Sequence, residues 1–188
     1  MNRDSEILIE ESLEQINKKP NPVWEWTKSI LIAVVIALII RVFLFQPTRV
    51  QGESMIHTLE NDDRIILNKI SMKISPLKRG NIVVLRYDRN QDYVKRIIGL
   101  PGENIQIIDG KVYINGELYE EDYITGDYTD TINGFEWKLN EDEYFVLGDN
   151  RQPGGSTDSR VFGPVHVNSI KGTVKFRYFP FNSFGVLK

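Results

Sequence analysis

The sequence predicts a mostly β protein, in which an antiparallel, β-rich domain is attached to one N-terminal transmembrane helix. A long apolar run near the N-terminus predicts the helix, and short β-rich runs separated by turn residues, from Pro47 onward, predict the domain. A chain of 188 residues can bury a hydrophobic core without cross-links. We expect three parts: a tail over 1–22, an anchor helix over 23–45 and the β-rich domain over 46–188.

The tail over 1–22 is polar and rich in acidic residues. Ile9, Leu13 and Ile16 lie at helical spacing, which predicts a short amphipathic helix. Helices of this length are marginal in water when they are isolated, so we interpret the segment as a mobile tail.

The apolar run is the expected membrane anchor. Every residue from Ile30 to Ile40 is apolar, and a helix over 23–45 would be about 34 Å long, enough to cross a hydrocarbon core of about 30 Å. Trp24 and Trp26 would lie in the interfacial belt. A buried core helix is one alternative, but no other segment is helical and apolar enough to surround it. A cleavable secretory signal is another, but the preceding tail is acidic and no A-x-A-like site follows the run.

After Pro47, short runs show the composition or alternation of strands. The pairs Asp109-Gly110 and Asn115-Gly116 predict consecutive tight hairpins. The expected strands are 64–67, 81–87, 93–98, 105–108, 111–114, 143–147 and 170–178.

The composition argues against several kinds of site. A net charge of −3 with mixed signs gives no reason to expect nucleic-acid binding. The chain has no cysteine, which removes disulfides, thiolate nucleophiles and cysteine zinc sites. With His57 and His166 as its only histidines, a histidine-rich metal site is not expected either. We expect neither a metal nor an organic cofactor, and the composition gives no oligomeric state.

Three segments carry groups typical of a serine–lysine hydrolase. Ser54 follows closely after the apolar run, Lys95 lies in an apolar predicted strand, and a polar loop over 148–160 contains further serines. Alternation along the strand puts Lys95 and Arg96 on opposite faces. If Lys95 is buried, its pKa falls from about 10.4 towards neutrality, as a general base requires. Taken singly, each segment also fits an ordinary structure: a surface serine, a solvated lysine, or a loop with paired charges.

Taken together, four blocks resemble the type I signal peptidases in content and order, in their short, single-span bacterial form. The resemblance covers the chain from about Val23 to the C-terminus. The blocks are Gly52-Glu53-Ser54-Met55 with Thr58-Leu59; Arg79-Gly80 with Ile82-Val83-Val84; Tyr93-Val94-Lys95-Arg96 with Gly99 and Pro101-Gly102; and Gly148-Asp149-Asn150-Arg151 with Ser156, Asp158, Ser159 and Arg160.

The resemblance implies a role for each matching residue. Ser54 would be the nucleophile, Lys95 the general base, and Ser156 would orient the lysine amine. The supporting residues would be Asp158 and Arg160, which stabilise the loop that carries Ser156, and Arg96, which pairs with Asp149.

The implied substrate is a secretory preprotein with its signal peptide. It would bind as an extended strand along 51–54, in contact with Gln51, Gly52 and Met55. Shallow apolar pockets would accept the small residues that precede the cut. The Ser54 amide would hold the oxyanion. Gly52 stands where some members of the family carry a hydroxyl, so no side chain at that position can help.

Three positions depart from the family pattern. His57 stands where proline is usual, Asn81 stands where aspartate is usual, and the loop over 152–155 is longer than usual. One hypothesis makes His57 an accessory base, because imidazole titrates near neutrality. The other places it in a tolerant turn, since strand alternation would put it on the opposite face from Ser54 and an intact Lys95 block leaves no vacancy for another base.

The resemblance therefore implies a membrane-bound serine endopeptidase that cleaves signal peptides from exported preproteins with a Ser/Lys dyad. Its partners would be preproteins and membrane lipid. It would cross the cell membrane once, with a cytoplasmic N-terminus and an extracytoplasmic catalytic domain, an orientation that the basic residues flanking the anchor favour only weakly. The alternatives are another serine–lysine protease, such as a self-cleaving repressor, and an inactive paralogue that binds secretory substrates without cutting them.

Overall fold

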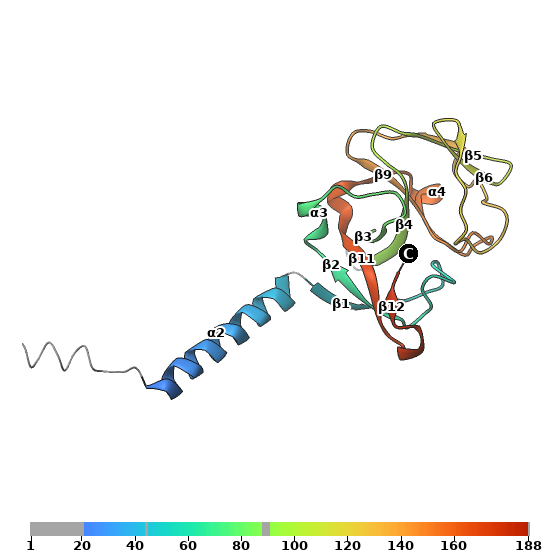
Figure 1. Cartoon of the computed structure of the whole chain (residues 1–188). Coiled ribbons are helices and arrows are strands. Elements are labelled where there is room, and N and C mark those ends of the chain that lie inside the picture. The colour runs from blue at the N-terminus through green and yellow to red at the C-terminus, as the bar shows by residue number, and fades with distance from the viewer. Residues whose placement is uncertain (1–20, 44, 88–90, 188) are drawn as a thin grey trace, which may run out of the picture. The chain divides into compact units, whose positions relative to one another are not determined.

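The computed structural model describes residues 21–43, 45–87 and 91–187, and the chain divides into two units, Met1–Val42 and Phe43–Lys188. Almost all of the tail expected over 1–22 lies outside the described residues. The first unit contains helix α2 (Pro22–Phe43) apart from its last residue, and the second contains the described strands (Figure 1).

Helix α2 begins at residues that commonly start helices. The Asn21 side chain accepts a hydrogen bond from the Val23 amide at 3.1 Å, and Pro22 occupies the first helical position. Glu25 in the first turn suits the helix dipole, and Lys28 donates a hydrogen bond to it at 2.5 Å. Interactions between neighbouring residues therefore favour a helix at the start of the apolar segment.

The large apolar side chains of α2 from Val23 to Leu38 are exposed. Among the described residues, however, no helix combines the length and the apolar character that a membrane span needs. The anchor predicted over 23–45 is not confirmed.

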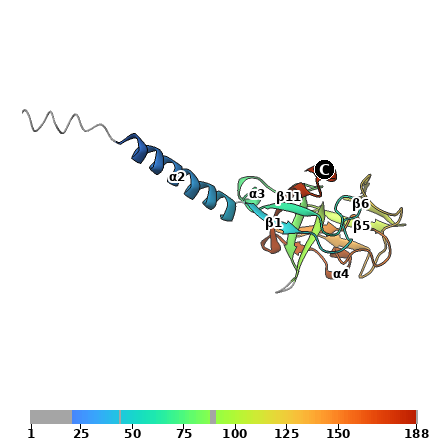
Figure 2. The same ribbon diagram turned by 90° about the horizontal axis from the view of Figure 1, so that it is seen from below.

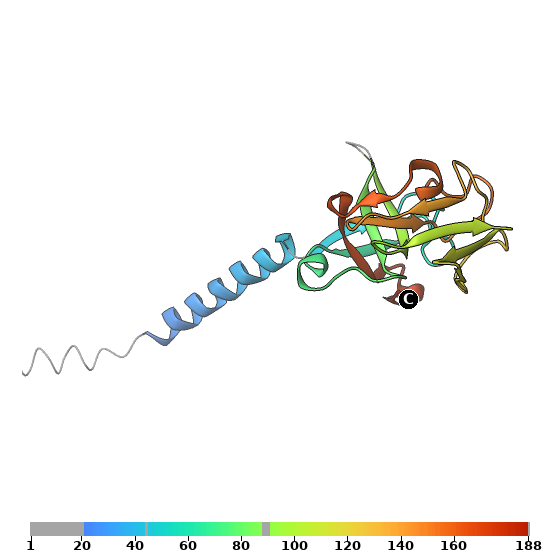
Figure 3. The same ribbon diagram turned by 90° about the horizontal axis from the view of Figure 1, so that it is seen from above.

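The second unit is built from antiparallel sheets, which confirms the mostly β prediction (Figure 3). The larger sheet has the order β1 (Phe45–Arg49), β2 (Arg64–Asn68), β11 (Ile170–Phe179), β3 (Ile82–Arg86), β4 (Asp92–Gly99), β9 (Glu143–Leu147) and β10 (Val165–His166), and β12 (Gly185–Val186) also pairs with β11. The smaller sheet has the order β7 (Glu117–Leu118), β6 (Lys111–Ile114), β5 (Asn104–Ile108) and β8 (Glu136–Lys138).

Within this unit, the smaller sheet lies on the side remote from β1 (Figure 1, Figure 2). Four short helical segments complete the described part of the unit. They are α3 (Ser71–Ile74), α4 (Ser159–Phe162), η1 (Val167–Ser169) and η2 (Phe181–Ser183).

Tight hairpins join β5 to β6 and β6 to β7, as predicted. Asp109 and Gly110 have φ of 49° and 75°, and Asn115 and Gly116 have φ of 53° and 87°. Two-residue turns with these left-handed conformations match the twist of the flanking strands, and Asn, Asp and Gly adopt them most easily. Each of the expected strands also corresponds to an observed one.

Two parts of the second unit differ from expectation. The stretch 51–59 forms turns rather than a strand, with the Leu59 amide donating to the Met55 carbonyl at 2.8 Å. Strand alternation therefore does not apply to Ser54 and His57, and the prediction that it places them on opposite faces was wrong. Strand β1 was not predicted, because Pro47 interrupts its pattern. A proline is tolerated there because β1 is an edge strand.

Strand β3 lies between the two parts of the core that support the larger sheet. Ile82 and Val84 pack into one buried cluster, whereas Val83 and Leu85 pack into another. Burial on both faces explains the unbroken apolar sequence of this strand. The first cluster also contains Met55, so the core fixes the turn that carries Ser54 beside β3 and β4.

Candidate active site

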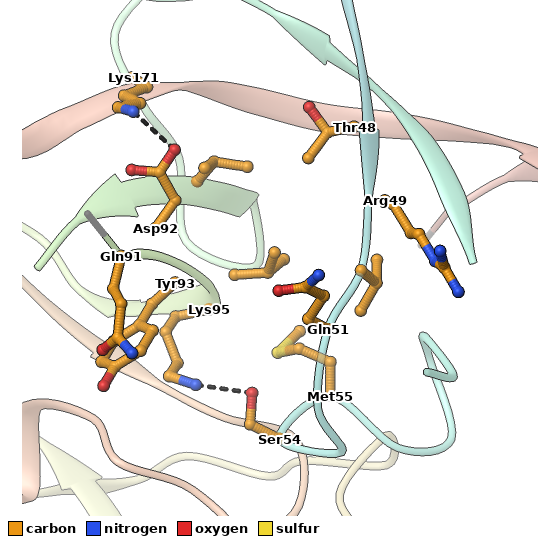
Figure 4. A pocket seen from close by; sticks show the side chains of 13 residues that line it. Thr48, Arg49, Gln51, Ser54, Met55, Gln91, Asp92, Tyr93, Lys95 and Lys171 are labelled. Atoms are coloured by element: carbon orange, nitrogen blue, oxygen red, sulfur yellow. Dashed lines mark hydrogen bonds and ion pairs between the residues drawn. The ribbon is translucent and has the colours of Figure 1, made fainter. Parts of the chain in front are cut away.

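Strand β4 carries Lys95 to the hydroxyl of Ser54. The Lys95 side chain is buried, and its Nζ donates a hydrogen bond to Ser54 Oγ at 2.6 Å (Figure 4). The ring of Tyr93 has its centroid 5.2 Å from the same nitrogen. The expectation that Lys95 is buried is confirmed.

Burial lowers the pKa of Lys95 from 10.5 to about 8. The charges of Asp158 and Asp149 act in the opposite direction, and the charge of Arg160 adds to the lowering. Both carboxylates form ion pairs with arginines rather than with the lysine. In mildly alkaline solution much of the Lys95 amine is therefore neutral, the form that can accept a proton from a hydroxyl.

The turn that carries Ser54 is held by the core on one side and by Asn150 on the other. Met55 and Leu59 are buried. The Asn150 backbone amide donates to the Ser54 carbonyl at 3.0 Å, and the Asn150 side-chain amide donates to the Glu53 carbonyl at 3.1 Å. Asn150 had no predicted role, although one of the four blocks contains it.

On the other face of β4, Arg96 forms a bidentate ion pair with Asp149. Arg96 Nε and Nη2 donate to the two carboxylate oxygens at 2.9 and 2.6 Å, and both side chains are buried. Thr58 donates its hydroxyl to the same carboxylate at 2.6 Å. Burial alone would lower the pKa of Arg96, but the hydrogen bonds and charge of Asp149 outweigh it and raise the pKa. The predicted pairing of Arg96 with Asp149 is observed, and through Thr58 it reaches the turn of Ser54.

Asp158 and Arg160 form the second buried pair near Lys95. Arg160 Nε and Nη2 each donate to the Asp158 carboxylate at 2.8 Å, and the Gly148 amide donates to it at 3.0 Å. Burial opposes ionisation of Asp158, but the hydrogen bonds and charge of Arg160 outweigh it and lower the pKa of the carboxyl. The pair thus ties the start of α4 to the end of β9.

Ser156 lies close to the dyad, but it makes no hydrogen bond to Lys95. A Cβ added at Gly148 would lie 2.2 Å from Ser156 Oγ and 2.5 Å from the Ser54 carbonyl oxygen, so both residues lie against the same face of Gly148. The Ser156 hydroxyl is buried, and it makes no hydrogen bond of normal geometry with any described group. It is nevertheless close enough to Asp158 to help lower the pKa of that carboxyl.

A cleft of about 520 Å³ opens beside Ser54 and Lys95. Of the residues predicted to contact substrate, Gln51 and Met55 line it, whereas Gly52 does not. The remaining lining residues come from β1 and the residue after it, from strands β3, β4 and β11, and from the residue before β4 (Figure 4). They are Thr48, Arg49, Val50, Val84, Gln91, Asp92, Tyr93, Val94 and Lys171.

The three departures from the family pattern have local accounts in the structure. The His57 side chain is 79% exposed in a turn, and its nearest acid is Glu60 at 3.9 Å. Asn81 Oδ1 accepts a hydrogen bond from the Lys78 amide at 3.0 Å, a role that needs only an acceptor. The longer loop closes on itself and brings Gly155 against Asn150, where an added Cβ would lie 2.5 Å from Asn150 Oδ1.

Within the described part of the chain, no group of three or more histidine, cysteine, aspartate or glutamate residues is placed to hold a metal ion.

Known proteins with similar sequences agree on one family. The family described as signal peptidase, peptidase S26, matches residues 23–179. Signal peptidase I of Bacillus amyloliquefaciens is 44% identical over 180 residues, which cover 91% of this chain and 96% of that protein. Signal peptidase I T of Bacillus subtilis (strain 168) is 42% identical over 181 residues, which cover 88% and 90%. A solved signal peptidase I from Enterococcus faecalis V583 is 34% identical and covers 53% of this chain and 97% of that chain, with a TM-score of 0.43, too low to compare the folds.

Proposed function

The chain belongs to the signal peptidase family, peptidase S26, and is a serine peptidase; from this premise we propose that it cleaves signal peptides from exported preproteins with a Ser54–Lys95 dyad, at a membrane. The observation that carries the proposal is the hydrogen bond of 2.6 Å from the buried Lys95 amine to Ser54 Oγ. This contact also argues against an inactive paralogue, because it joins a nucleophile to a base with a lowered pKa.

In the proposed reaction, Ser54 Oγ attacks the scissile carbonyl carbon while the neutral Lys95 amine takes the hydroxyl proton. The tetrahedral intermediate collapses to an ester on Ser54, and the Lys95 ammonium gives its proton to the departing amine of the mature protein. Water then attacks the ester while Lys95 takes a proton from it. The second intermediate collapses, the Lys95 ammonium returns that proton to Ser54 Oγ, and the signal peptide leaves with a new C-terminal carboxyl group. Lysine can serve both steps because its pKa of about 8 lies close to the working pH.

The surrounding residues would keep this geometry. The Ser54 amide would donate to the oxyanion, without help from a side chain at Gly52. The Ser156 hydroxyl, which has no partner of normal geometry among the described residues, would accept a hydrogen bond from Lys95 once the oxygen of Ser54 becomes part of the ester. The ion pairs of Arg96 with Asp149 and of Arg160 with Asp158 would hold the loops on either side.

The preprotein would lie in the cleft as an extended chain, between the segment before Ser54 and strand β4. Gln51 offers a side-chain amide at the exposed wall, and Met55 contributes the buried apolar wall. An apolar wall beside the nucleophile suits the small residues that precede the cut in signal peptides.

Membrane attachment through residues 23–45 is the part of the proposal that rests on the sequence pattern. The exposed apolar side chains of α2 support it, because an apolar helix surface left in water is unfavourable. We propose a single span with the N-terminus in the cytoplasm and the β-rich unit outside. If this is correct, protease added to intact protoplasts digests the chain after Pro47 and spares the tail. A protected β-rich unit with a digested tail would reverse the orientation.

The decisive experiment uses the full-length protein in detergent and a preprotein whose signal peptide ends in small residues. The wild type should release the mature protein, and Ser54→Ala should reduce the rate by about a thousandfold or more. Ser75→Ala, which changes an exposed serine outside the cleft, should cleave at the wild-type rate. Undiminished cleavage by Ser54→Ala would require another nucleophile, and an inert wild type would remove the proposed function.

A further inference from the structure

The aromatic ring of Tyr93 lies beside the Lys95 amine. Lys95 Nζ is 5.2 Å from the centroid of the ring, within the range at which the face of an aromatic ring attracts a cation. The two residues are two positions apart on β4, so their side chains extend from the same face of the strand (Figure 4). Tyr93 lines the cleft, but it takes part in none of the proton transfers proposed for Ser54 and Lys95.

Two further aromatic side chains hold the Tyr93 ring in place. Tyr87, which directly follows β3, is stacked on Tyr93 with a centroid distance of 4.8 Å and an interplanar angle of 16°. Phe162, the last residue of α4, has its ring centroid 6.5 Å from that of Tyr93 and 5.1 Å from that of Tyr87. Contacts from outside β4 therefore restrict the Tyr93 ring to its position beside Lys95.

The other surroundings of Lys95 disfavour its charged form on balance. Burial is the largest influence, and it lowers the pKa of Lys95 to about 8. Asp158 and Asp149 favour the charge and Arg160 opposes it, and both carboxylates are held in ion pairs with arginines. Val83 of β3, which pairs in register with Lys95, carries no charge. The proton transfer from the nucleophile nevertheless has to create an ammonium ion at this site.

We propose that Tyr93 is a positioning residue whose ring face stabilises the Lys95 ammonium ion that forms as Ser54 attacks the substrate. The proposal rests on the proposed function, because it takes Lys95 to be the general base. The strength of the contact suits this task. A carboxylate in place of the ring would keep the lysine protonated and unable to act as a base, whereas a cation–π contact is weak enough to leave much of the amine neutral.

The contact should have a definite effect on the pH profile. At low pH the free enzyme already carries the ammonium ion, so the ring stabilises the free enzyme and the transition state alike, and removing the ring should leave kcat/KM unchanged. Above about pH 8 the amine begins neutral and only the transition state gains, so removing the ring should lower kcat/KM by about fivefold. The rising limb should then move to lower pH by roughly 0.7 units, because one pH unit corresponds to a tenfold change.

The test measures kcat/KM of Tyr93→Leu between about pH 6 and about pH 9.5, with the full-length protein in detergent and a preprotein whose signal peptide ends in small residues. Tyr93→Phe keeps the ring and should reproduce the wild-type profile. Tyr113→Leu is the matched control, because Tyr113 is also half-buried on a strand but does not line the cleft, and its profile should be unchanged. The position of the limb does not depend on the amount of folded enzyme.

A second variant keeps the shape of an aromatic ring. Pentafluorophenylalanine in place of Tyr93 is close to phenylalanine in size, but fluorine removes the negative charge from the face of the ring. It should therefore move the limb to lower pH as Tyr93→Leu does, and it provides the test if Tyr93→Leu does not fold.

A loss by the same factor at every pH would overturn the proposal, because Tyr93 would then act only by contacting the substrate. A limb that moves to higher pH would overturn it too, since the ring would then act by excluding water from Lys95. An unchanged profile, or a Tyr93→Phe profile that matches Tyr93→Leu, would have the same consequence. Failure of the proposed function is a separate result: the wild type would then leave the preprotein uncut, or Ser54→Ala would cut it equally well.

Discussion

Two neighbouring cations on β4 are equally buried, yet they have opposite chemistry. Lys95 and Arg96 are each 2% exposed. Lys95 meets a neutral hydroxyl, and burial lowers its pKa to about 8, whereas Arg96 meets Asp149, whose charge and hydrogen bonds raise its pKa against the effect of burial. The partner, and not burial alone, decides whether a buried cation becomes a reactive base or a fixed charge.

The two faces of the strand also support each other. Asp149, the partner of Arg96, is followed directly by Asn150, which holds the backbone of Ser54 and Glu53. The fixed ion pair on one face therefore positions the loop that fixes the nucleophile beside Lys95 on the other face.

Replacing Lys95 should have the largest effect of all, and that effect is on catalysis. Lys95→Met should reduce preprotein cleavage by about a thousandfold or more, because no base remains for Ser54. Lys95→Arg should be as inactive, since a guanidinium stays protonated at any working pH. Initial rates with the full-length protein in detergent measure both, and Lys175→Met controls for the loss of a lysine elsewhere. Full activity in Lys95→Arg would exclude lysine as the base.

On the opposite face, the largest effect should be on stability. Arg96→Met leaves the Asp149 carboxylate buried without its partner and should lower the free energy of unfolding by roughly 3–5 kcal/mol. Urea unfolding of the full-length protein in detergent measures the loss. The double variant Arg96→Met with Asp149→Leu should recover much of it, because two apolar side chains can replace a buried pair. If the single variant unfolds like the wild type, the pair is not structural.

Replacing Lys95 should have the reverse effect on stability. The native pKa of about 8 lies below the unfolded value of 10.5, so below pH 8 the lysine is charged in both states and burial costs roughly 3 kcal/mol. Between pH 8 and 10.5 the native state loses its proton first and the cost declines. Lys95→Met should therefore be more stable than the wild type at pH 7, by an amount that shrinks towards pH 10.5. A gain that does not change with pH would mean that packing, not charge, causes it.

A smaller effect on catalysis is expected when the contacts of Asn150 with the turn that carries Ser54 are weakened. Asn150→Asp keeps the shape of the side chain but loses the amide that donates to Glu53, and we expect kcat to fall about tenfold with KM little changed, since a small misplacement of the nucleophile is costly. Gly155→Ala should have a similar effect, because a Cβ there would displace the Asn150 side chain. Unchanged kcat in both variants would leave Asn150 without a positioning role.

The sequence predicted what local patterns encode. The alternation along 93–98 placed Lys95 and Arg96 on opposite faces, and the Asp-Gly and Asn-Gly pairs predicted the hairpins. Contacts between segments that are distant in the sequence could not be predicted from local patterns. Thr125 belongs to none of the four blocks, yet its hydroxyl donates to the Ile56 carbonyl at 2.7 Å.

Buried ion pairs between residues that are far apart in the sequence could not be predicted either. Arg151 was part of a block, but its partner Glu121 lies 30 residues earlier, and both side chains are buried. The extended conformation assumed for Ser54 and His57 was wrong for the same reason, because the turn over 51–59 packs on the core through Met55 and Leu59, and the sequence does not show these contacts.

The smallest effect should come from His57, and it tests whether Lys95 is the one base whose titration governs the rate. His57 is 79% exposed, in a turn, and its nearest acid is Glu60 at 3.9 Å. Because general bases act only within hydrogen-bond reach of the proton that they remove, His57→Ala should cleave preproteins at close to the wild-type rate. Both enzymes should show kcat/KM rising with pH through about 8, since the free enzyme must lose the Lys95 proton before it can act as a base. A rising limb that moves when histidine is removed, with Ser54 still essential, would show that a histidine-dependent step precedes or assists the lysine.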